Sequence, residues 1–190
     1  MGVSIRSLID YAWLTVGIIW LLSAFGTKRA VRQYIGPSRI VQIVLLVLAF
    51  LLVFSRYSQI GFLGWRVIPP SQTSSIAGAA LVFAGLLLAL WARFFLGRNW
   101  SGEITVKQDH ELVRSGPYAV VRHPIYSGFL LGLLGTAIAI GQVRCFVGLI
   151  LATIGWRLKS LVEEQFMAEQ FGAQYTSYRR DVKALIPFIW

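Results

Sequence analysis

Two segments in the C-terminal half of this 190-residue chain hold seven of its eight acidic residues. The first, residues 99–128, also contains both histidines of the chain, His110 and His123. The second, residues 157–190, begins with the run RLKSLVEE, which brings a lysine and two glutamates together. Histidine and glutamate are side chains that commonly move protons in enzymes. We therefore expect any chemistry to take place in these two segments.

Within the first segment, Pro124 follows His123 at the start of an apolar run that is typical of a helix. A helix accepts proline at its first position, and the first turn has free N–H groups and partial positive charge. Such a helix end can hold a carboxylate or phosphate of a ligand. The alternative is that Arg122 and His123 only anchor the helix end at the membrane surface.

In the second segment, Lys159 and Glu163 are four residues apart and share a helix face, as do Ser160 and Glu164. Ionisable residues near a membrane boundary are candidates for function. The alternative is a surface helix whose basic side faces anionic lipid headgroups.

Other kinds of site find no support in the sequence. Two histidines and the single Cys145 do not form a zinc set, so we expect no metal. The chain has no Gly-rich nucleotide motif after a strand, no P-loop and no Ser-His-Asp arrangement. A lone cysteine also excludes an intramolecular disulfide framework.

The composition places these segments in a membrane protein. Hydrophobic residues make up 56% of the chain and charged residues only 14%, where a soluble domain has about a quarter. We predict an all-α, polytopic membrane protein with five transmembrane helices and a cytoplasmic C-terminal helix. The predicted spans are Ser7–Gly26, Ile40–Phe54, Ile76–Leu96, Ile125–Ile140 and Val143–Leu158.

The last two spans are separated only by Gly141 and Gln142, which predicts an antiparallel hairpin. Each span carries small residues at i, i+4 and i+7, a spacing that lets two helix backbones approach closely in lipid. We therefore expect the two stripes to face each other. The stripes are Gly128, Gly132 and Gly135, and Gly148, Ala152 and Gly155.

The net charge of +10 is distributed unevenly along the chain. Fourteen of the 18 basic residues follow the first, third or fifth span, which predicts a cytoplasmic C-terminus and an external N-terminus. These basic residues lie at membrane borders, so we expect no nucleic-acid partner. We divide the chain into an N-terminal part of three helices, 1–96, and a catalytic part, 97–190, which together form one integral unit.

The run HELVRSGPYAVVRHPIYSG, from His110 to Gly128, resembles the isoprenylcysteine carboxyl methyltransferase (ICMT) family. The pattern EExxxxxxFGxxYxxY, from Glu163 to Tyr178, resembles the same family. The two motifs stand in the family's order on either side of a helical hairpin, and the resemblance covers about Asn99 to Pro187. Phospholipid N-methyltransferases of membranes share this C-terminal pattern.

The resemblance implies an enzyme that uses S-adenosyl-L-methionine and releases S-adenosyl-L-homocysteine. Glu103 stands where the family usually has an amide side chain. Lys159 stands at the family's substrate-facing arginine, and a lysine offers a point charge where arginine offers a two-pronged grip. The cofactor contacts implied by the resemblance are Glu103, His110, Leu112, Val113, Tyr118, His123, Pro124, Ile125 and Tyr126.

We predict methyl transfer at the cytoplasmic membrane face to a lipophilic acceptor, preferably the C-terminal carboxylate of an isoprenylcysteine. The predicted catalytic residues are Arg122, Lys159 and Glu163, and the expected partners are membrane lipid and a prenylated or other lipophilic acceptor. An ionised carboxylate needs no strong base and could be held by Lys159 or Arg122. An amine acceptor would lose a proton, for which Glu163 or Glu164 is the candidate.

Three alternatives remain open at this point. The chain could be a phospholipid N-methyltransferase. It could be a membrane reductase, since some sterol reductases resemble the same C-terminal pattern, although they generally have longer chains. It could also be a small transporter or lipid-binding protein without enzymatic activity, although its predicted spans carry almost no charge near their centres.

Overall fold

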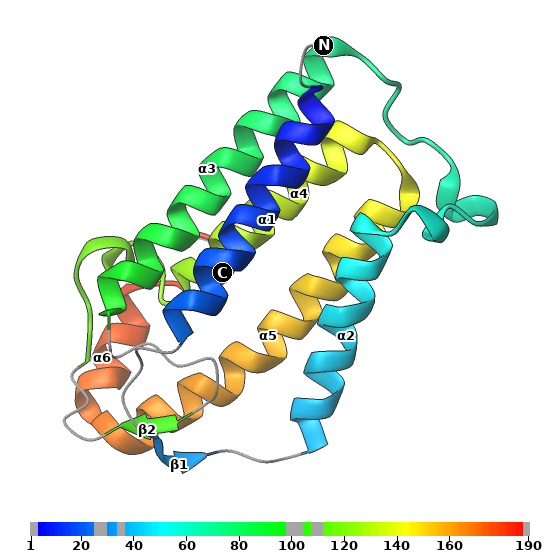
Figure 1. Cartoon of the computed structure of the whole chain (residues 1–190). Helices are drawn as coiled ribbons and strands as arrows, with labels where there is room; N and C mark the ends of the chain where they lie inside the picture. Colours follow the sequence, from blue (N-terminus) through cyan, green and yellow to red (C-terminus); the bar gives the residue numbers. More distant parts are fainter. Residues whose placement is uncertain (1–3, 25–29, 34–36, 98–104, 108–111, 188–190) are drawn as a thin grey trace.

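A computed structural model describes residues 4–24, 30–33, 37–97, 105–107 and 112–187 of the chain. Figure 1 shows long helices that run roughly parallel or antiparallel to one another. The helices are α1 (Ile5–Ala24), α2 (Pro37–Phe54), α3 (Gln72–Leu96), α4 (Pro124–Ile140), α5 (Val143–Phe171) and α6 (Ala173–Asp181). Among the described residues, three single 3-10 turns lie in the connections: Arg56–Ser58, Gly61–Gly64 and Gly116–Ala119. The predicted helical architecture is confirmed.

Two short strands were not predicted. β1 (Ala30–Gln33) follows α1, and β2 (Thr105–Lys107) lies between α3 and α4. They pair antiparallel, with an irregularity in register between Ala30 and Arg32. The pairing joins two connections that lie at the same end of the helices as α6 (Figure 1). Such short segments carry too little pattern in the sequence to be recognised as strands.

Length and apolar composition suit three of the helices for crossing a bilayer: α1, α3 and α5. The apolar parts of α2 and α4, Arg39–Phe54 and Pro124–Ile140, are shorter. The helix predicted to end at Leu158 continues without a break to Phe171, so α5 has 29 residues. Its additional turns carry Lys159, Glu163 and Glu164 beyond the apolar part of the bundle.

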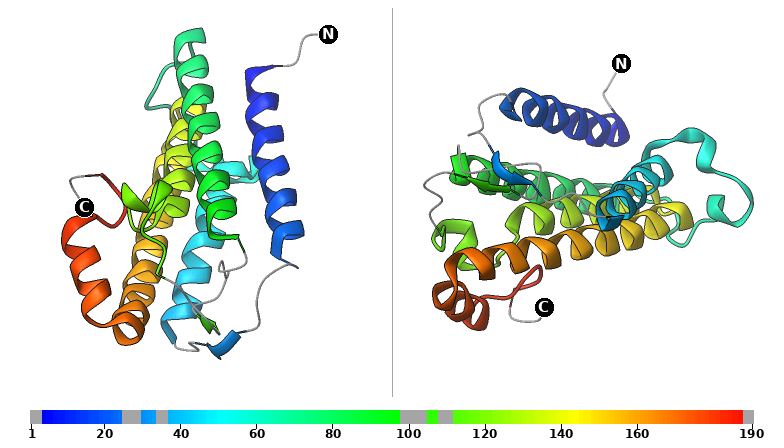
Figure 2. Two further views of the ribbon diagram at one scale, coloured as in Figure 1. Left: turned by 90° about the vertical axis from the view of Figure 1, so that its left-hand side faces the viewer. Right: turned by 90° about the horizontal axis from the view of Figure 1, so that it is seen from below.

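The predicted contact between the glycine stripes of α4 and α5 is wrong. The α4 stripe lies against α3, where a Cβ on Gly128 would come within 2.5 Å of the Gly85 carbonyl oxygen. Likewise, a Cβ on Gly135 would come within 2.5 Å of the Gly78 carbonyl oxygen. A short link makes neighbouring helices antiparallel but does not determine which face each turns to its neighbour. The extensive α3–α4 contact is visible in Figure 2.

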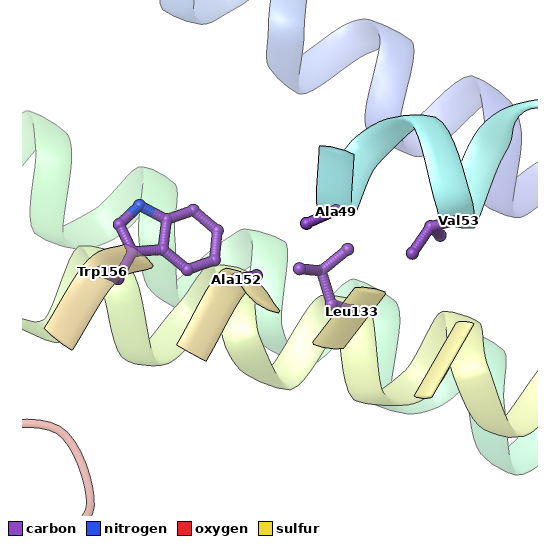
Figure 3. Packing of buried hydrophobic residues seen from close by; sticks show 5 residues of the cluster. All are labelled: Ala49, Val53, Leu133, Ala152 and Trp156. Carbon is purple, nitrogen blue, oxygen red and sulfur yellow. The ribbon is translucent and has the colours of Figure 1, made fainter. Parts of the chain in front are cut away.

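The glycine stripe of α5 instead lies against α2. A Cβ on Gly148 would meet the Ala49 carbonyl oxygen at 2.9 Å and a Val53 methyl at 2.8 Å. The buried cluster beside this contact joins α2, α4 and α5 (Figure 3). Its members are Ala49, Val53, Leu133, Ala152 and Trp156. Close backbone approach is therefore used twice, between α3 and α4 and between α2 and α5.

Several arginines bind the carbonyl groups that a helix leaves unpaired at its C-terminal end. Arg144 donates to three carbonyl oxygens at the end of α2 and is buried. Arg66 donates to the Ile140 carbonyl at the end of α4, 2.9 Å away. Arg93 donates to the Ser23 carbonyl at the end of α1, 2.7 Å away. A cation at this position complements the negative end of the helix dipole.

The close α3–α4 contact predicts that adding one methyl group at this contact lowers the stability of the protein. In Gly85→Ala the new Cβ would lie 2.4 Å from the Gly128 carbonyl oxygen and 2.5 Å from the Gly132 nitrogen. These backbone atoms cannot move aside as a flexible side chain would, so we expect a loss of about 1–3 kcal/mol of stability. Thermal unfolding of the detergent-solubilised protein measures it.

Gly17→Ala in α1 is the matched control, because a Cβ there meets no atom within 4 Å. Alanine is favoured over glycine inside a helix by up to about 1 kcal/mol. The melting temperature of Gly17→Ala should equal or exceed that of the unchanged protein. Equal melting temperatures for the two variants would contradict the close α3–α4 packing.

Candidate active site

The start of α4 is held by the C-terminal segment of the chain. The Arg122 N–H donates to the Lys183 carbonyl oxygen at 2.8 Å, and the His123 N–H donates to the Ala184 carbonyl oxygen at 3.0 Å. His123 is the N-cap residue of α4, and Pro124 occupies the first turn as predicted. This pairing places the Arg-His-Pro run beside the end of α6, although some 60 residues separate them in sequence.

A buried carboxylate, that of Glu164 on α5, lies at the centre of this region. Arg122 donates to its Oε1 through Nε at 3.2 Å and Nη2 at 2.7 Å. His123 Nε2 lies 3.2 Å from the same oxygen, and Arg179 Nε lies 3.4 Å from the Oε2. The Glu164 side chain is only 3% exposed. One carboxylate therefore ties α4, α5 and α6 together.

The neighbouring Glu163 faces a second group of partners. The Tyr126 hydroxyl donates to its Oε1 at 2.6 Å, and His123 Nδ1 lies 3.4 Å from its Oε2. Lys159 Nζ lies 3.8 Å from its Oε1 and 5.7 Å from the centre of the Tyr126 ring. His123 thus bridges the two glutamates through its two ring nitrogens.

These side chains form what we call the polar cluster. Its members are Arg122, His123, Tyr126, Lys159, Glu163, Glu164 and Arg179. All three residues predicted to be catalytic, Arg122, Lys159 and Glu163, belong to it. The guanidinium of Arg122 is engaged by Glu164 and by the carbonyl oxygens of Arg179 and Val182. Lys159 and Glu163 are each about 20% exposed and can be reached from outside.

The charge of His123 depends on the two glutamates. Burial alone would lower its pKa, but hydrogen bonds and charge from Glu163 and Glu164 outweigh burial and raise the pKa above its ordinary value. The protonated ring can donate to both carboxylates, whereas the neutral ring can donate to only one. The pair of glutamates therefore favours a positively charged His123.

The residues expected to bind the cofactor lie close to this cluster where the structure describes them. Val113, Tyr118, Ile125 and Tyr126 contribute to one hydrophobic group with Ala92 of α3. Pro124 is fully buried, and Leu112 is partly buried next to Val113 in the chain. Two further expected residues, Glu103 and His110, lie outside the described residues.

A stack of aromatic rings extends from the polar cluster into the bundle. The His123 and Tyr126 rings are 5.5 Å apart, Tyr126 and Trp156 are 6.0 Å apart, and Trp156 and Phe129 are 5.6 Å apart. All three pairs are nearly parallel, and we call these four residues the aromatic stack. Sequence reasoning missed Trp156, although its spacing of three and seven residues to Lys159 and Glu163 places all three on one helix face.

The second sequence motif also gains a structural explanation. The Tyr178 hydroxyl, on α6, donates to the Tyr118 carbonyl oxygen at 2.5 Å, and both Tyr175 and Tyr178 are buried. The Ser127 hydroxyl donates to the Leu185 carbonyl oxygen at 2.5 Å. These contacts fix α6 and the following residues against the start of α4. Tyr175 and Tyr178 therefore face protein and not the lipid headgroups.

A family model described as "Phospholipid methyltransferase" matches residues 73–174, more than half of the chain. The chain belongs to the phospholipid methyltransferase family. The matched range contains α4, α5 and all of α3 except its first residue, and it includes every member of the polar cluster except Arg179.

Curated relatives of this family member are isoprenylcysteine methyltransferases. Protein-S-isoprenylcysteine O-methyltransferase B of Arabidopsis thaliana is 30% identical over 117 residues, covering 59% of this chain and 58% of the relative. The Schizosaccharomyces pombe protein-S-isoprenylcysteine O-methyltransferase is 36% identical over 124 residues, covering 62% and 50%. The alignments thus span about half the length of these relatives. The ICMT resemblance predicted from the two motifs is confirmed.

A solved structure shows the same relationship. The eukaryotic intramembrane Ras methyltransferase ICMT (isoprenylcysteine carboxyl methyltransferase) matches with a TM-score of 0.52 and 27% identity. The match covers 79% of this chain and 52% of the other. The fold of this protein is therefore ICMT-like, and the chain is an integral membrane protein.

Removal of the Glu164 carboxylate should destabilise the whole site. Glu164→Ala leaves the buried Arg122 guanidinium without its anion, and breaking a buried ion pair typically costs about 3–5 kcal/mol. Glu169→Ala removes an equivalent charge from an exposed position on the same helix and should have little effect. Thermal unfolding compares the two variants, and similar melting temperatures would contradict the central role of Glu164.

The raised pKa of His123 predicts a pH dependence of stability. A group whose pKa is higher in the folded protein stabilises the fold when protonated. This contribution is complete below pH 6.5, the ordinary histidine value, and disappears as the pH rises through the raised value in the fold. His123→Gln should remove this part of the pH dependence. A melting temperature that falls equally with pH in both proteins would assign the effect to another group.

Proposed function

We propose that this protein transfers a methyl group from S-adenosyl-L-methionine to a lipophilic acceptor at the membrane surface. The preferred acceptor is the C-terminal carboxylate of an isoprenylcysteine. The observation that carries the proposal is the polar cluster, in which a partly exposed lysine stands over a tyrosine ring at the start of α4. The family membership and the names of the relatives support it.

The residues around the start of α4 fit this cofactor. The His123 ring accepts no hydrogen bond from the first-turn N–H groups of α4, so these groups can donate to a carboxylate. Tyr126 and Trp156 present nearly parallel aromatic rings, and such faces attract cations. Val113, Tyr118 and Ile125 supply apolar surface beside them. When bound, S-adenosyl-L-methionine supplies a methyl group on a positively charged sulfur that is already activated for displacement.

The chain's own residues then have to position the acceptor and exclude water. Lys159 can attract the acceptor carboxylate, which is a nucleophile when ionised and needs no strong base. Glu163 and the Tyr126 ring hold the Lys159 ammonium in place. The aromatic stack and the packed α6 limit the entry of water behind the site, which strengthens the electrostatic interactions there. We assign Arg122 a positioning role, because Glu164 and two backbone carbonyls occupy its guanidinium.

An amine acceptor is the second candidate, because the family model takes its description from phospholipid methylation. An amine must lose a proton during methyl transfer, and Glu163 is the partly exposed carboxylate that would accept it. Lys159 would repel a protonated amine but would hold a carboxylate. The positive charge of Lys159 therefore favours a carboxylate acceptor and disfavours an amine acceptor.

The membrane arrangement follows from the same proposal. All five helices α1 to α5 cross the bilayer, with the N-terminus outside and the polar cluster at the cytoplasmic face. The 17 residues of α4 extend about 25 Å, slightly less than the hydrocarbon core, and local thinning of the bilayer compensates. The excess of basic residues after the first, third and fifth helices supports this orientation.

The first test asks whether the protein binds the cofactor product. Calorimetric titration of the detergent-solubilised protein with S-adenosyl-L-homocysteine should show saturable binding. Labelled methyl donor should then transfer its label to an S-prenylcysteine, giving a methyl ester that base releases. Transfer of a base-stable label to phosphatidylethanolamine would favour the amine acceptor. The absence of S-adenosyl-L-homocysteine binding would contradict both versions of the proposal.

The second test addresses Lys159. We expect Lys159→Met to lower kcat/KM for the carboxylate acceptor about tenfold or more, since a hydrogen bond to a charged group is lost. S-adenosyl-L-homocysteine binding should stay unchanged, and Lys159→Arg should keep most activity. Lys183→Met is the control for loss of an exposed lysine at the same face. Full activity of Lys159→Met would contradict a role for this ammonium in binding the acceptor.

A further inference from the structure

A large cavity lies between α1 and the helices α2 and α4, apart from the polar cluster. Its volume is about 1410 Å³, which exceeds the range of about 300–1,000 Å³ typical of pockets for small molecules. Among the described residues, its lining comes from α1, α2, α4, the first turn of α5 and the connections at the far end of the bundle. Neither Lys159 nor the two glutamates of the polar cluster belong to this lining.

The middle of the cavity is apolar and open. Trp13 and Trp20 of α1, Phe50 and Phe54 of α2, and Phe129 of α4 line it. Gly17 of α1 also lines it, and a Cβ built on this glycine meets no atom within 4 Å. The space beside Gly17 is therefore wide enough for a hydrocarbon chain to run along α1.

The end of the cavity farther from the polar cluster is polar and positively charged. Arg6, Arg66 and Arg144 line it together with the single acid Asp10. Arg144 is bound to the end of α2, and Arg6 pairs with Asp10 at 3.2 Å while remaining about 40% exposed. Arg66 is exposed and donates one hydrogen bond, from Nη1 to the Ile140 carbonyl. Arg6 and Arg66 can therefore both approach an anion at this end.

At the end of the cavity nearer the polar cluster, Trp20 of α1 lies 5.0 Å from the ring of Phe129. This ring stacks on Trp156 at 5.6 Å, and the aromatic stack continues from there to His123. A hydrocarbon tail that entered from the polar cluster would have to displace this stack and would end against guanidinium groups. An amphiphile in the opposite orientation places its charge beside the arginines and its chain beside the aromatic rings. In that orientation the charged group lies at the charged end of the cavity and the hydrocarbon chain lies in its apolar part.

We propose that this cavity binds an anionic membrane phospholipid. The phosphate lies at Arg6 and Arg66, and an acyl chain runs past Gly17 toward Phe129. The lipid completes the packing of α1, which contacts mainly α3 and is tied to α4 by a hydrogen bond from Trp13 Nε1 to Thr136 at 3.0 Å. The site is separate from methyl transfer, so it stands whether the acceptor is a carboxylate or an amine.

Brominated lipids test the proposal directly, because bromine quenches tryptophan fluorescence at contact and Trp13 and Trp20 line the cavity. Delipidated protein in detergent is titrated with phosphatidylglycerol brominated on its acyl chains, and with phosphatidylcholine brominated in the same way. We expect saturable quenching at lower concentration for phosphatidylglycerol. Equal quenching curves for the two lipids would mean that bilayer lipid fills the cavity without recognition of charge, and would overturn the proposal.

Two substitutions locate the lipid. Arg66→Gln should weaken phosphatidylglycerol binding about fivefold, the effect of removing one basic residue from an anionic lipid surface. Arg180→Gln removes the same charge from an exposed position on α6, at the other end of the bundle, and should leave the affinity unchanged. Arg6→Gln repeats the test without touching the end of α4. Unchanged affinity in both Arg66→Gln and Arg6→Gln would overturn the proposal.

Gly17→Leu places a bulky side chain in the cavity at a position where the Cβ meets no atom within 4 Å, and should abolish the saturable quenching. Leu22→Phe adds bulk to an exposed position of α1 outside the cavity lining and should leave the saturable quenching unchanged.

A methyl-transfer assay of Gly17→Leu distinguishes this site from the acceptor site. A higher KM for the acceptor in Gly17→Leu, with phosphatidylglycerol binding intact, would assign the cavity to the acceptor's tail and overturn the proposal. Unaltered KM with lost phosphatidylglycerol binding is the expected result.

Discussion

The contact of the buried Glu164 carboxylate with Arg122 and His123 is the interaction on which the geometry of the site depends. Arg122 and His123 immediately precede α4, Glu164 lies on α5, and Arg179 adds α6 from the other side. A carboxylate that is 3% exposed can remain ionised only when cations and donors surround it. Because the same histidine also reaches Glu163, the buried ion pair determines where the partly exposed Lys159 and Glu163 lie. The buried contacts of Glu164 thus position the partly exposed residues of the site.

The C-terminal ends of helices bind three of the basic residues that give this chain its excess of positive charge. The chain has 18 basic and eight acidic residues, so at least ten basic residues must obtain compensating negative charge from another group or from water. Arg66, Arg93 and Arg144 find it in the unpaired carbonyl groups at the ends of α4, α1 and α2. The distribution of basic residues along the chain therefore reflects helix ends as well as membrane sides. Both uses place arginine at the boundary of the apolar region, which is why sequence reasoning could not tell them apart.

Much of the architecture could be predicted from local sequence. Apolar runs located all five long helices, because hydrophobicity over a span is a property of consecutive residues. The proline after His123 correctly indicated the start of α4, and two motifs indicated the family before any geometry was available. The partners of the glycine stripes could not be predicted, because small residues permit close approach without specifying the neighbour. The role of Trp156 was missed because a tryptophan within an apolar run is equally typical of packing.

The polar cluster was predicted in outline and not in its connections. Spacing placed Lys159 and Glu163 on one helix face, but nothing local showed that Glu164 faces inward against Arg122. That contact joins residues 42 positions apart and depends on how α4 and α5 pack. Tyr178 similarly closes a contact with the Tyr118 carbonyl across 60 positions. Long-range contacts of this kind arise from tertiary packing, which a single sequence does not report.

The unbroken course of α5 has a mechanical consequence. The helix runs from Arg144, bound to the end of α2, to Glu164, bound to Arg122, over about 30 Å without a proline. Sharp kinks in helices need a specific cause such as proline, so a helix of this kind moves as a rod. A small tilt of α5 about its contact with α2 would shift Glu163 and Lys159 together, preserving their mutual distance. Because His123 and Tyr126 lie at the start of α4, the same tilt would change the distances from Glu163 and Lys159 to these two rings.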